Sequence, residues 1–206
     1  MSPYSYLAWC WLRENKQWAE ENWGPLILRP VLMSRVIKSH ETKGPAEIRP
    51  KREYLLRECL RIASIENIPF KCPDKLPFNN LIVARLGCID KGQFEIVDLL
   101  FRLGWEEGQS LEDEDFLLSY LEGKGLEKSS ISSWIDDKNS RIALKKNCSE
   151  AIEKGLFGVP SFLLIDGEDE ELFWGRESIS HLKLKIDNND PLDQNDYCDF
   201  LSRIQI

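Results

Sequence analysis

The sequence predicts an α/β protein in which an all-helical block interrupts a smaller part that carries the strands. Between about residues 51 and 139, apolar residues recur at helical spacing and glycines separate the periodic segments. Two short apolar runs, 158–165 and 171–174, flank the turn signal Asp166-Gly167 and predict a β-hairpin. With 206 residues and 42% apolar content, the chain can bury the core of one domain that carries an insertion.

The first element is a helix that begins at Ser2-Pro3 and runs to about Glu21. A serine oxygen can accept from free N–H groups of the first turn, and proline fits the first helical position. A helix N-terminus carries partial positive charge, so it stabilises an anion such as a thiolate. Ser2 and Ser5 place hydroxyls where a thiol oxidoreductase would carry two cysteines. Taken by itself, Ser2 is more simply explained as a helix cap.

The later elements follow from periodicity and turn residues. Residues 25–32 form an apolar run that predicts a buried strand, and residues 39–50 predict a loop. Helices are predicted over 51–66, 79–89, 93–105, 113–121, 129–135, 140–155 and 178–186, with a last helix starting at Pro191. We therefore expect two domains, a strand-bearing domain of residues 1–50 and 140–206 and a helical insertion of residues 51–139.

This order of elements is that of a thioredoxin-like fold from which the first strand is missing and into which helices are inserted. Pro160 stands at the start of the hairpin, facing the N-terminus of the first helix. In that fold this position holds a cis-proline whose neighbouring backbone pairs with a bound peptide. We therefore predict a cis bond between Val159 and Pro160, against the alternative of an ordinary trans proline.

Charge and cysteine usage exclude several classes of protein. The 27 basic and 35 acidic side chains give a net charge of -8, which repels nucleic acid and anionic membranes. No run approaches the roughly 18 apolar residues of a membrane span, and the start lacks the layout of a secretory signal, so we expect a cytoplasmic protein. Six cysteines without a C-x-x-C pair and only two histidines predict free thiols and no metal site.

Five motifs in order carry a family resemblance: Ser2-Pro-Tyr-Ser-Tyr-Leu-Ala8, Leu76-Pro-Phe-Asn79, Gly104-Trp-Glu-Glu-Gly108, Gly155-Leu-Phe-Gly-Val-Pro-Ser161 and Phe173-Trp-Gly175. Together they resemble the 2-hydroxychromene-2-carboxylate isomerases and their kappa-class glutathione transferase relatives. The resemblance extends from Ser2 to about Leu184. It implies a thioredoxin-like fold with a helical insertion, use of glutathione, a small-molecule substrate and a homodimer.

The resemblance also implies roles for single residues. Ser2 matches the serine that contacts the glutathione sulfur, and Lys51 matches a lysine that reaches a glutathione carboxylate. Val159, before the predicted cis-Pro160, matches the position whose backbone pairs with the cysteinyl part of glutathione. Asn79 matches an asparagine near the substrate pocket. From the residues alone, Lys51 is equally a solvated lysine at a helix start, and Asn79 is more simply a helix cap.

Two departures from the family pattern bear on glutathione binding and on the sheet. Arg176 and Glu177 are expected at the glutathione, with Glu177 offering a carboxylate to the γ-glutamyl ammonium, but Ser178 replaces a family arginine. Family members also carry an apolar strand before the serine. We therefore expect that the start of this sequence is displaced and that a strand is encoded upstream.

The function that this resemblance implies is a glutathione-dependent isomerase of aromatic catabolic intermediates. The thiolate would add to a conjugated double bond, the resulting single bond would rotate, and elimination would release the other isomer. Two alternatives remain open, a kappa-class-like glutathione transferase or peroxidase and a non-catalytic thioredoxin-fold binding protein. A disulfide oxidoreductase ranks last, because serines stand in place of the redox cysteines.

Overall fold

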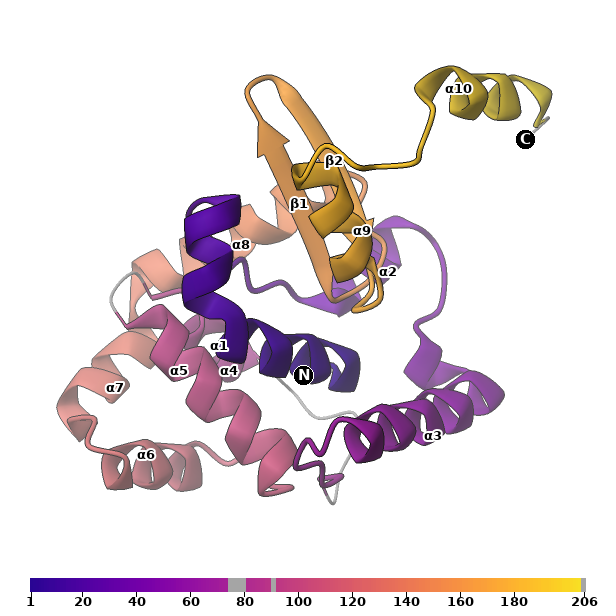
Figure 1. Ribbon diagram of the computed structural model, residues 1–206. Helices are drawn as coiled ribbons and strands as arrows, with labels where there is room; N and C mark the ends of the chain where they lie inside the picture. The colour runs from indigo at the N-terminus through magenta and orange to yellow at the C-terminus, as the bar shows by residue number, and fades with distance from the viewer. Residues whose placement is uncertain (74–80, 90–91, 205–206) are drawn as a thin grey trace.

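The structure is a computed structural model that describes residues 1–73, 81–89 and 92–204. Figure 1 shows two regions, with a hairpin and its covering helix at one end of the molecule and a group of helices at the other. Before and after the middle of the chain the elements are α1 (Pro3–Trp23), α2 (Met33–Ser39), α8 (Lys138–Glu153), β1 (Ser161–Asp166), β2 (Asp169–Trp174), α9 (Ser178–Ile186) and α10 (Gln194–Arg203). The other helices are α3 (Arg49–Ile65), α4 (Leu81–Leu86), α5 (Gln93–Phe101), α6 (Glu114–Gly123) and α7 (Lys128–Asp136), with a 3₁₀ turn at Pro45–Glu47 and a π-helical turn at Arg102–Glu106.

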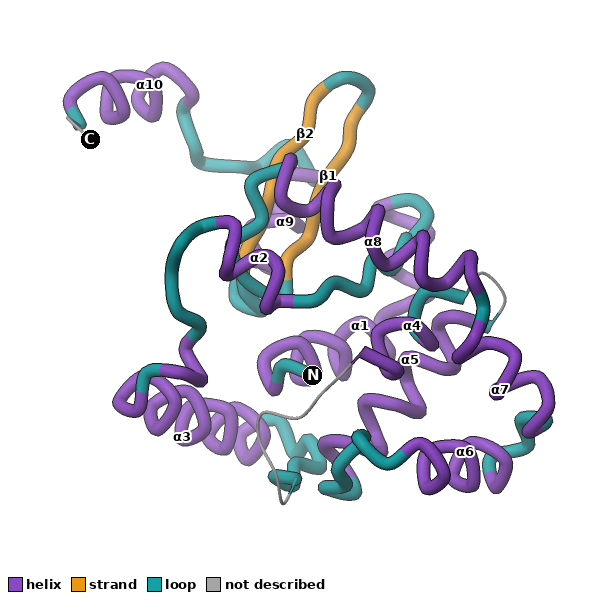
Figure 2. The backbone as a smooth tube through the Cα atoms, turned by 180° about the vertical axis from the view of Figure 1, so that it is seen from behind, coloured by secondary structure: helices purple, strands orange, loops and turns teal. Residues whose placement is uncertain are grey.

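The predicted hairpin is confirmed. Strands β1 and β2 pair antiparallel, in a register that runs from Ser161 opposite Trp174 to Asp166 opposite Asp169. Gly167 in the turn has φ +63°, a left-handed conformation that glycine adopts without strain. Helix α9 packs on β2 and covers one face of the hairpin (Figures 1 and 2).

The strand predicted over residues 25–32 is wrong. These residues have no regular secondary structure, and within the described part of the chain the sheet consists of β1 and β2 alone. Leu26 and Leu28 pack beside the tryptophans of α1, whereas Ile27 between them is 67% exposed. Buried and exposed side chains thus alternate in this segment as they do in a strand. A β-strand also needs ladder hydrogen bonds to a neighbouring strand, and no described strand pairs with this segment. The sequence analysis also missed the short helix α2, which directly follows this segment.

The middle of the chain is helical, as predicted. One apolar core lies among α4, α5, α6 and α7 and is made of Leu, Ile and Val side chains such as Leu103, Leu117 and Ile131, all fully buried. A second core joins α1 to α3 and contains Tyr6, Leu7, Cys10, Cys59, Ala63 and Trp105. The two cores lie on either side of the π-helical turn. Helix α1 is consequently held by the helical block along one side.

Three tryptophans of α1, Trp11, Trp18 and Trp23, form an aromatic cluster that also contacts α9. Trp11 and Trp23 stack with ring centroids 5.5 Å apart, and Trp18 meets Trp23 edge-on at 5.3 Å. The ammonium of Lys183 on α9 lies 4.4 Å from the ring centroid of Trp18, a cation–π contact. Because α9 also packs on β2, this contact couples α1 to the hairpin. Within the described residues, no helix has the length and apolar content to cross a membrane.

All six cysteines are free thiols, and four of them are buried. Burial is the largest cause of the raised thiol pKa values of Cys59 and Cys88, which reach about 12 and about 11. Burial also raises the pKa of Cys10. Because the thiolate is the reactive form, these thiols are inert at neutral pH.

We expect an aromatic disulfide reagent to titrate two thiols of the native protein at pH 8, Cys72 and Cys198, which are exposed. The four buried thiols should react only after unfolding, because burial keeps the reagent away from them. For Cys59, a pKa of about 12 also leaves on the order of one thiolate in ten thousand at that pH. Stopped-flow absorbance in buffer and in guanidinium chloride measures both numbers. Rapid reaction of a third thiol in the native protein would contradict this assignment.

Candidate functional site

The start of α1 is built by Ser2 and Pro3. Ser2 is the N-cap, with extended backbone (φ −83°, ψ 133°), and its Oγ accepts from the Ser5 N–H at 3.3 Å. Its carbonyl oxygen accepts from the Tyr6 N–H at 3.1 Å. The capping bond uses Ser2 Oγ only as an acceptor, and a hydroxyl has one O–H donor besides its acceptor lone pairs. Capping the helix and donating to an anion are therefore compatible roles for the same side chain.

The loop before β1 contains the cis peptide bond that the sequence predicted, between Val159 and Pro160. The Pro160 carbonyl accepts from the Gly175 N–H at 2.9 Å, and Ser161 Oγ donates to the Gly158 carbonyl at 2.7 Å. Within the described residues, no hydrogen bond occupies the N–H or the carbonyl of Val159. The opposite views of Figures 1 and 2 both place the chain's N-terminus below the end of the hairpin where β1 begins. This leaves Val159 with backbone groups that can pair with a ligand.

An aromatic pair flanks this loop. The rings of Phe157 and Trp174 lie 5.0 Å apart, and both residues are more than half exposed. Gly158 sits directly against the indole, because a Cβ built on it would lie 2.3 Å from Trp174 Nε1. Real Cβ atoms do not approach that closely, so the residue at 158 must be glycine while Trp174 holds this position.

We expect Gly158→Ala to lower the free energy of unfolding by about 1 kcal/mol, the low end of the cost of forcing in an extra methyl group, because the half-exposed Trp174 ring can shift. Gly123→Ala is the matched control, since its Cβ would meet nothing within 4 Å. The control should be neutral or up to about 1 kcal/mol more stable. Urea unfolding measures both changes. Adding Trp174→Leu should restore most of the loss at Gly158, and failure to restore it would show that another contact is responsible.

The corner after β2 carries the two residues expected at glutathione. Gly175 has φ +89° and turns the chain, and the buried Ser178 donates through Oγ to the Gly175 carbonyl at 2.7 Å. The guanidinium of Arg176 forms an ion pair with the carboxylate of Glu66, the residue that ends α3. The structure therefore gives Arg176 an internal partner, which the sequence did not indicate.

Tyr4 marks the place where α1, α3 and this corner meet. Burial raises the pKa of its phenol to about 12, and the nearby acidic groups Cys59, Glu177 and Glu58 raise it further. Glu58 and Glu177 also raise the pKa of Cys59. The first turn of α1 thus lies within electrostatic reach of Glu177, as a glutathione site spanning both would require. The carboxylates near Tyr4 favour a ligand that carries an ammonium group.

Lys51 lies in the first turn of α3 and is exposed. It belongs to the helical row of Leu55, Glu58 and Ile62, of which Leu55 and Ile62 pack against α1. Within the described part of the chain, no ion pair engages its ammonium. Lys51 is thus on the side of α3 that faces the start of α1. Asn79, predicted near the substrate, lies outside the described residues.

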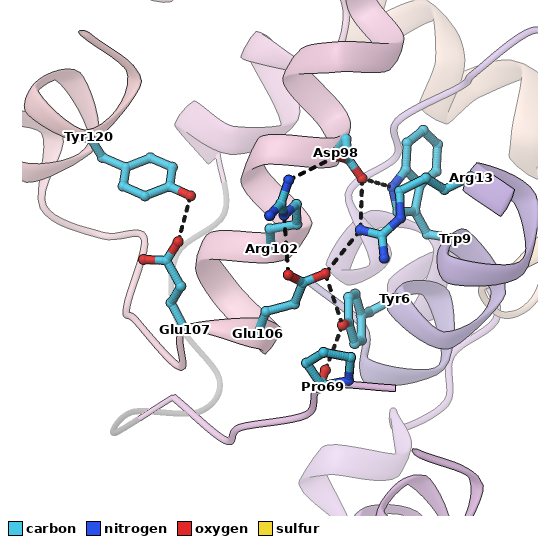
Figure 3. A network of polar contacts seen from close by, with 9 residues as sticks. All are labelled: Tyr6, Trp9, Arg13, Pro69, Asp98, Arg102, Glu106, Glu107 and Tyr120. Atoms are coloured by element: carbon cyan, nitrogen blue, oxygen red, sulfur yellow. Dashed lines mark hydrogen bonds and ion pairs between the residues drawn. The ribbon is translucent and has the colours of Figure 1, made fainter. Parts of the chain in front are cut away.

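A polar network that the sequence analysis missed fixes α1 against α5 and the π-helical turn (Figure 3). Arg13 of α1 donates through Nη1 to Asp98 at 3.1 Å and to Glu106 at 2.9 Å. Trp9 Nε1 donates to the same Asp98 oxygen at 2.8 Å, and Tyr6 donates to the Pro69 carbonyl at 2.6 Å. Asp98 and Glu106 stand in a segment that also contains Glu95 and Glu107, so the local sequence does not mark them as partners of Arg13.

Among the described residues, no group of three or more His, Cys, Asp or Glu side chains could hold a metal ion. The polar groups that this region offers are a hydroxyl at a helix N-terminus, an open backbone pairing position beside a cis-proline, and carboxylates near Tyr4. These groups can orient a peptide-like ligand and stabilise an anion.

Comparisons with known proteins bear on the fold of the chain. The model of the DSBA-like thioredoxin domain family matches residues 1–187. Two relatives are 2-hydroxychromene-2-carboxylate isomerases, from Sphingobium xenophagum (23% identical, covering 89% of this chain and 92% of the relative) and from Pseudomonas putida (23% identical, covering 89% and 88%). A solved structure of a 2-hydroxychromene-2-carboxylate isomerase superposes with a TM-score of 0.74 over 91% of this chain and 90% of the other, at 22% identity. These matches confirm the predicted thioredoxin-like fold with inserted helices.

Proposed function

Because the chain belongs to the DSBA-like thioredoxin domain family, we propose that it is a glutathione-dependent isomerase acting on 2-hydroxychromene-2-carboxylate or a similar aromatic intermediate. The substrate class is taken from the two relatives and the solved structure, all named 2-hydroxychromene-2-carboxylate isomerase. The observation that carries the proposal is Ser2 at the start of α1, where its O–H remains a donor while its Oγ caps the helix.

Ser2 and the helix would together activate the glutathione sulfur. A free thiol titrates near ~8.5. The helix N-terminus contributes about 0.3–1 kcal/mol to an anion, and a hydrogen bond to a charged group contributes about 1.5–3 kcal/mol. The sum lowers the thiol pKa by roughly 1.5–3 units, since each unit corresponds to about 1.4 kcal/mol. The thiolate would then be the main form at neutral pH, whereas either effect by itself would be marginal.

The reaction needs no oxidant and consumes no glutathione. The thiolate adds to the conjugated double bond, so that a C–S bond forms and the C=C bond becomes a single bond. Rotation about that bond and elimination of the thiolate restore the double bond in the other geometry. Ser2 would orient the sulfur. Because its side chain is a hydroxyl and not a thiol, Ser2 cannot trap the sulfur in a mixed disulfide. Lys51 would hold an anionic group of the cofactor or substrate.

Glutathione itself would be held by the loop before β1 and the corner after β2. The free backbone groups of Val159, beside Pro160, would pair with the cysteinyl part, and Glu177 would attract the γ-glutamyl ammonium. Arg176 pairs with Glu66 through Nη2, and Nε has no partner among the described residues, so the guanidinium would keep further N–H donors for a glutathione carboxylate. Arg176 and Glu177 are therefore both candidates for direct contact at this corner.

The test is an absorbance assay of 2-hydroxychromene-2-carboxylate isomerisation by the purified protein. The proposal expects turnover with glutathione and none with S-methylglutathione, which offers the same peptide without a free thiol. Turnover without any thiol would contradict the cofactor assignment. Conjugation of an electrophile without isomerisation would indicate a transferase instead. Inactivity in both assays, with a melting temperature that millimolar glutathione leaves unchanged, would indicate the binding-protein alternative.

A further inference from the structure

Helix α10 is an amphipathic helix that packs on no other element within the described part of the chain. Tyr197, Phe200, Leu201 and Ile204 follow the spacing i, i+3, i+4, i+7 and form one apolar stripe, here called the α10 stripe. These four residues are between 47% and 70% exposed, and no residue of α10 is buried. An isolated helix of this length is marginal in water, so a stripe of this kind indicates a surface that covers it.

Within the described residues, the polar contacts of α10 join only residues of the helix and of its N-cap. Asp193 caps the helix by accepting from the Asn195 and Asp196 N–H groups, and Arg203 pairs with Asp199. Figures 1 and 2 both show α10 standing away from the hairpin and the other helices. The preceding Asp190 is held to Lys185 of α9 at 3.5 Å, so only residues 191–193 link this anchored point to the helix.

The outer face of α3 combines exposed apolar side chains with arginines, and so offers a surface on which the α10 stripe could pack. Leu60 and Ile65 are 57% and 78% exposed there, and with Arg57, Arg61 and Ser64 they line a shallow open depression, here called the α3 surface. This surface is on the side of α3 turned away from Cys59, which packs against α1.

The charges of the two helices are opposite. Helix α3 carries five basic and two acidic side chains in a chain whose net charge is -8. Helix α10 carries two aspartates against one arginine, and Asp190 and Asp193 precede it. Arg61 is paired with Glu58 at 3.2 Å on an exposed part of α3, whereas no ion pair engages Arg57 among the described residues. An acidic apolar helix therefore fits the α3 surface in both sign of charge and hydrophobic character.

Because α10 and α3 lie far apart in one copy, α10 would have to reach the α3 surface of a second copy. Opposite views place α10 and α3 at opposite ends of the molecule, and the three-residue link at 191–193 cannot carry α10 across it (Figures 1 and 2). We propose that α10 of one copy docks with its stripe on the α3 surface of a second copy, and that the reciprocal contact closes a symmetric dimer. This inference is independent of the proposed catalytic activity.

Complementary charge reversals test the contact. Variant R57E/R61E makes α3 acidic, and variant D196K/D199K makes α10 basic, so each variant by itself brings like charges together. Sedimentation velocity should show that wild type is a dimer and that each variant dissociates about tenfold or more readily. An equimolar mixture of the two variants should re-form a dimer, because both of its contacts then join opposite charges. If the equimolar mixture contains no heterodimer, and one variant is still a dimer while the other is a monomer, the proposal is overturned.

Two controls separate this contact from general effects of charge. Variant K138E/K145E makes the same charge change on the exposed face of α8 and should leave the dimer intact. Variant F200S/L201S removes the two central residues of the α10 stripe without touching any buried contact, so it should yield a folded monomer with unchanged thermal unfolding of the remaining protein. A monomeric wild type at every concentration, or a dimer that survives F200S/L201S, would contradict the docking of α10 on α3.

Discussion

Replacing Ser2 by alanine is expected to lower isomerase turnover at least tenfold. In the proposed mechanism the change would remove one hydrogen bond to the thiolate, worth about 1.5–3 kcal/mol, and would leave the contribution of the helix N-terminus in place. The glutathione thiol should then titrate closer to its value in water, so the fall in activity should be largest near neutral pH and smaller under alkaline conditions. Steady-state kinetics against pH, with glutathione in excess, measure the effect.

The same change also removes a helix cap, which costs about 0.5–2 kcal/mol of stability by itself. Asp113→Ala is the matched control, because Asp113 caps α6 through an equivalent bond from the Phe116 N–H at 3.0 Å. Both variants should lose similar stability, and only the Ser2 variant should lose turnover. If the two variants keep the same turnover, Ser2 is a cap and nothing more.

The parts of the site that the sequence revealed are those with a local cause. Ser2-Pro3 forms a cap because a hydroxyl and a fixed φ satisfy the first turn of any helix. The Asp166-Gly167 turn sets the hairpin register within a few residues. Val159–Pro160 was predicted as cis from its place between a helix and a strand, and the structure has it so.

The parts that the sequence concealed depend on partners far away in the chain. Residues 25–32 have the composition of a strand, but composition does not say whether a neighbouring strand is present to pair with them. Arg176 was expected at glutathione, yet it pairs with Glu66, 110 residues earlier. No periodicity of one segment encodes such a pair. Asn79 stays a prediction, because it lies outside the described residues.

The network around Arg13 is the clearest long-range feature, since its carboxylates lie 85 and 93 residues away in sequence. The Arg13 side chain is 28% exposed, and those of Asp98 and Glu106 are 18% and 16% exposed. Glu106 lies in the π-helical turn, where it also accepts from Arg102 Nε at 3.1 Å. The turn therefore aims a carboxylate at α1, and α1 carries Ser2 at its start.

Arg13→Met is expected to lower the free energy of unfolding by about 2–3 kcal/mol. Removing one partner of a buried ion pair costs about 3–5 kcal/mol, because the other charge stays in the interior without compensation, and the partial exposure of these groups reduces that cost. Arg49→Met is the control, since the Arg49–Glu53 pair is largely exposed and exposed pairs contribute about 0–1 kcal/mol. Urea unfolding at low and high salt distinguishes the two, because salt should weaken only the effect at Arg49.

A triple variant, Arg13→Met with Asp98→Asn and Glu106→Gln, gives the physical reason for that loss. If the penalty comes from two uncompensated carboxylates, neutralising both should recover a large part of the stability that Arg13→Met removes. If the triple variant is as unstable as the single one, the packing of the arginine stem along Trp9 and Tyr6 is the larger contribution. An Arg13→Met protein no less stable than Arg49→Met would refute both explanations and show that the second core positions α1 without help from this network.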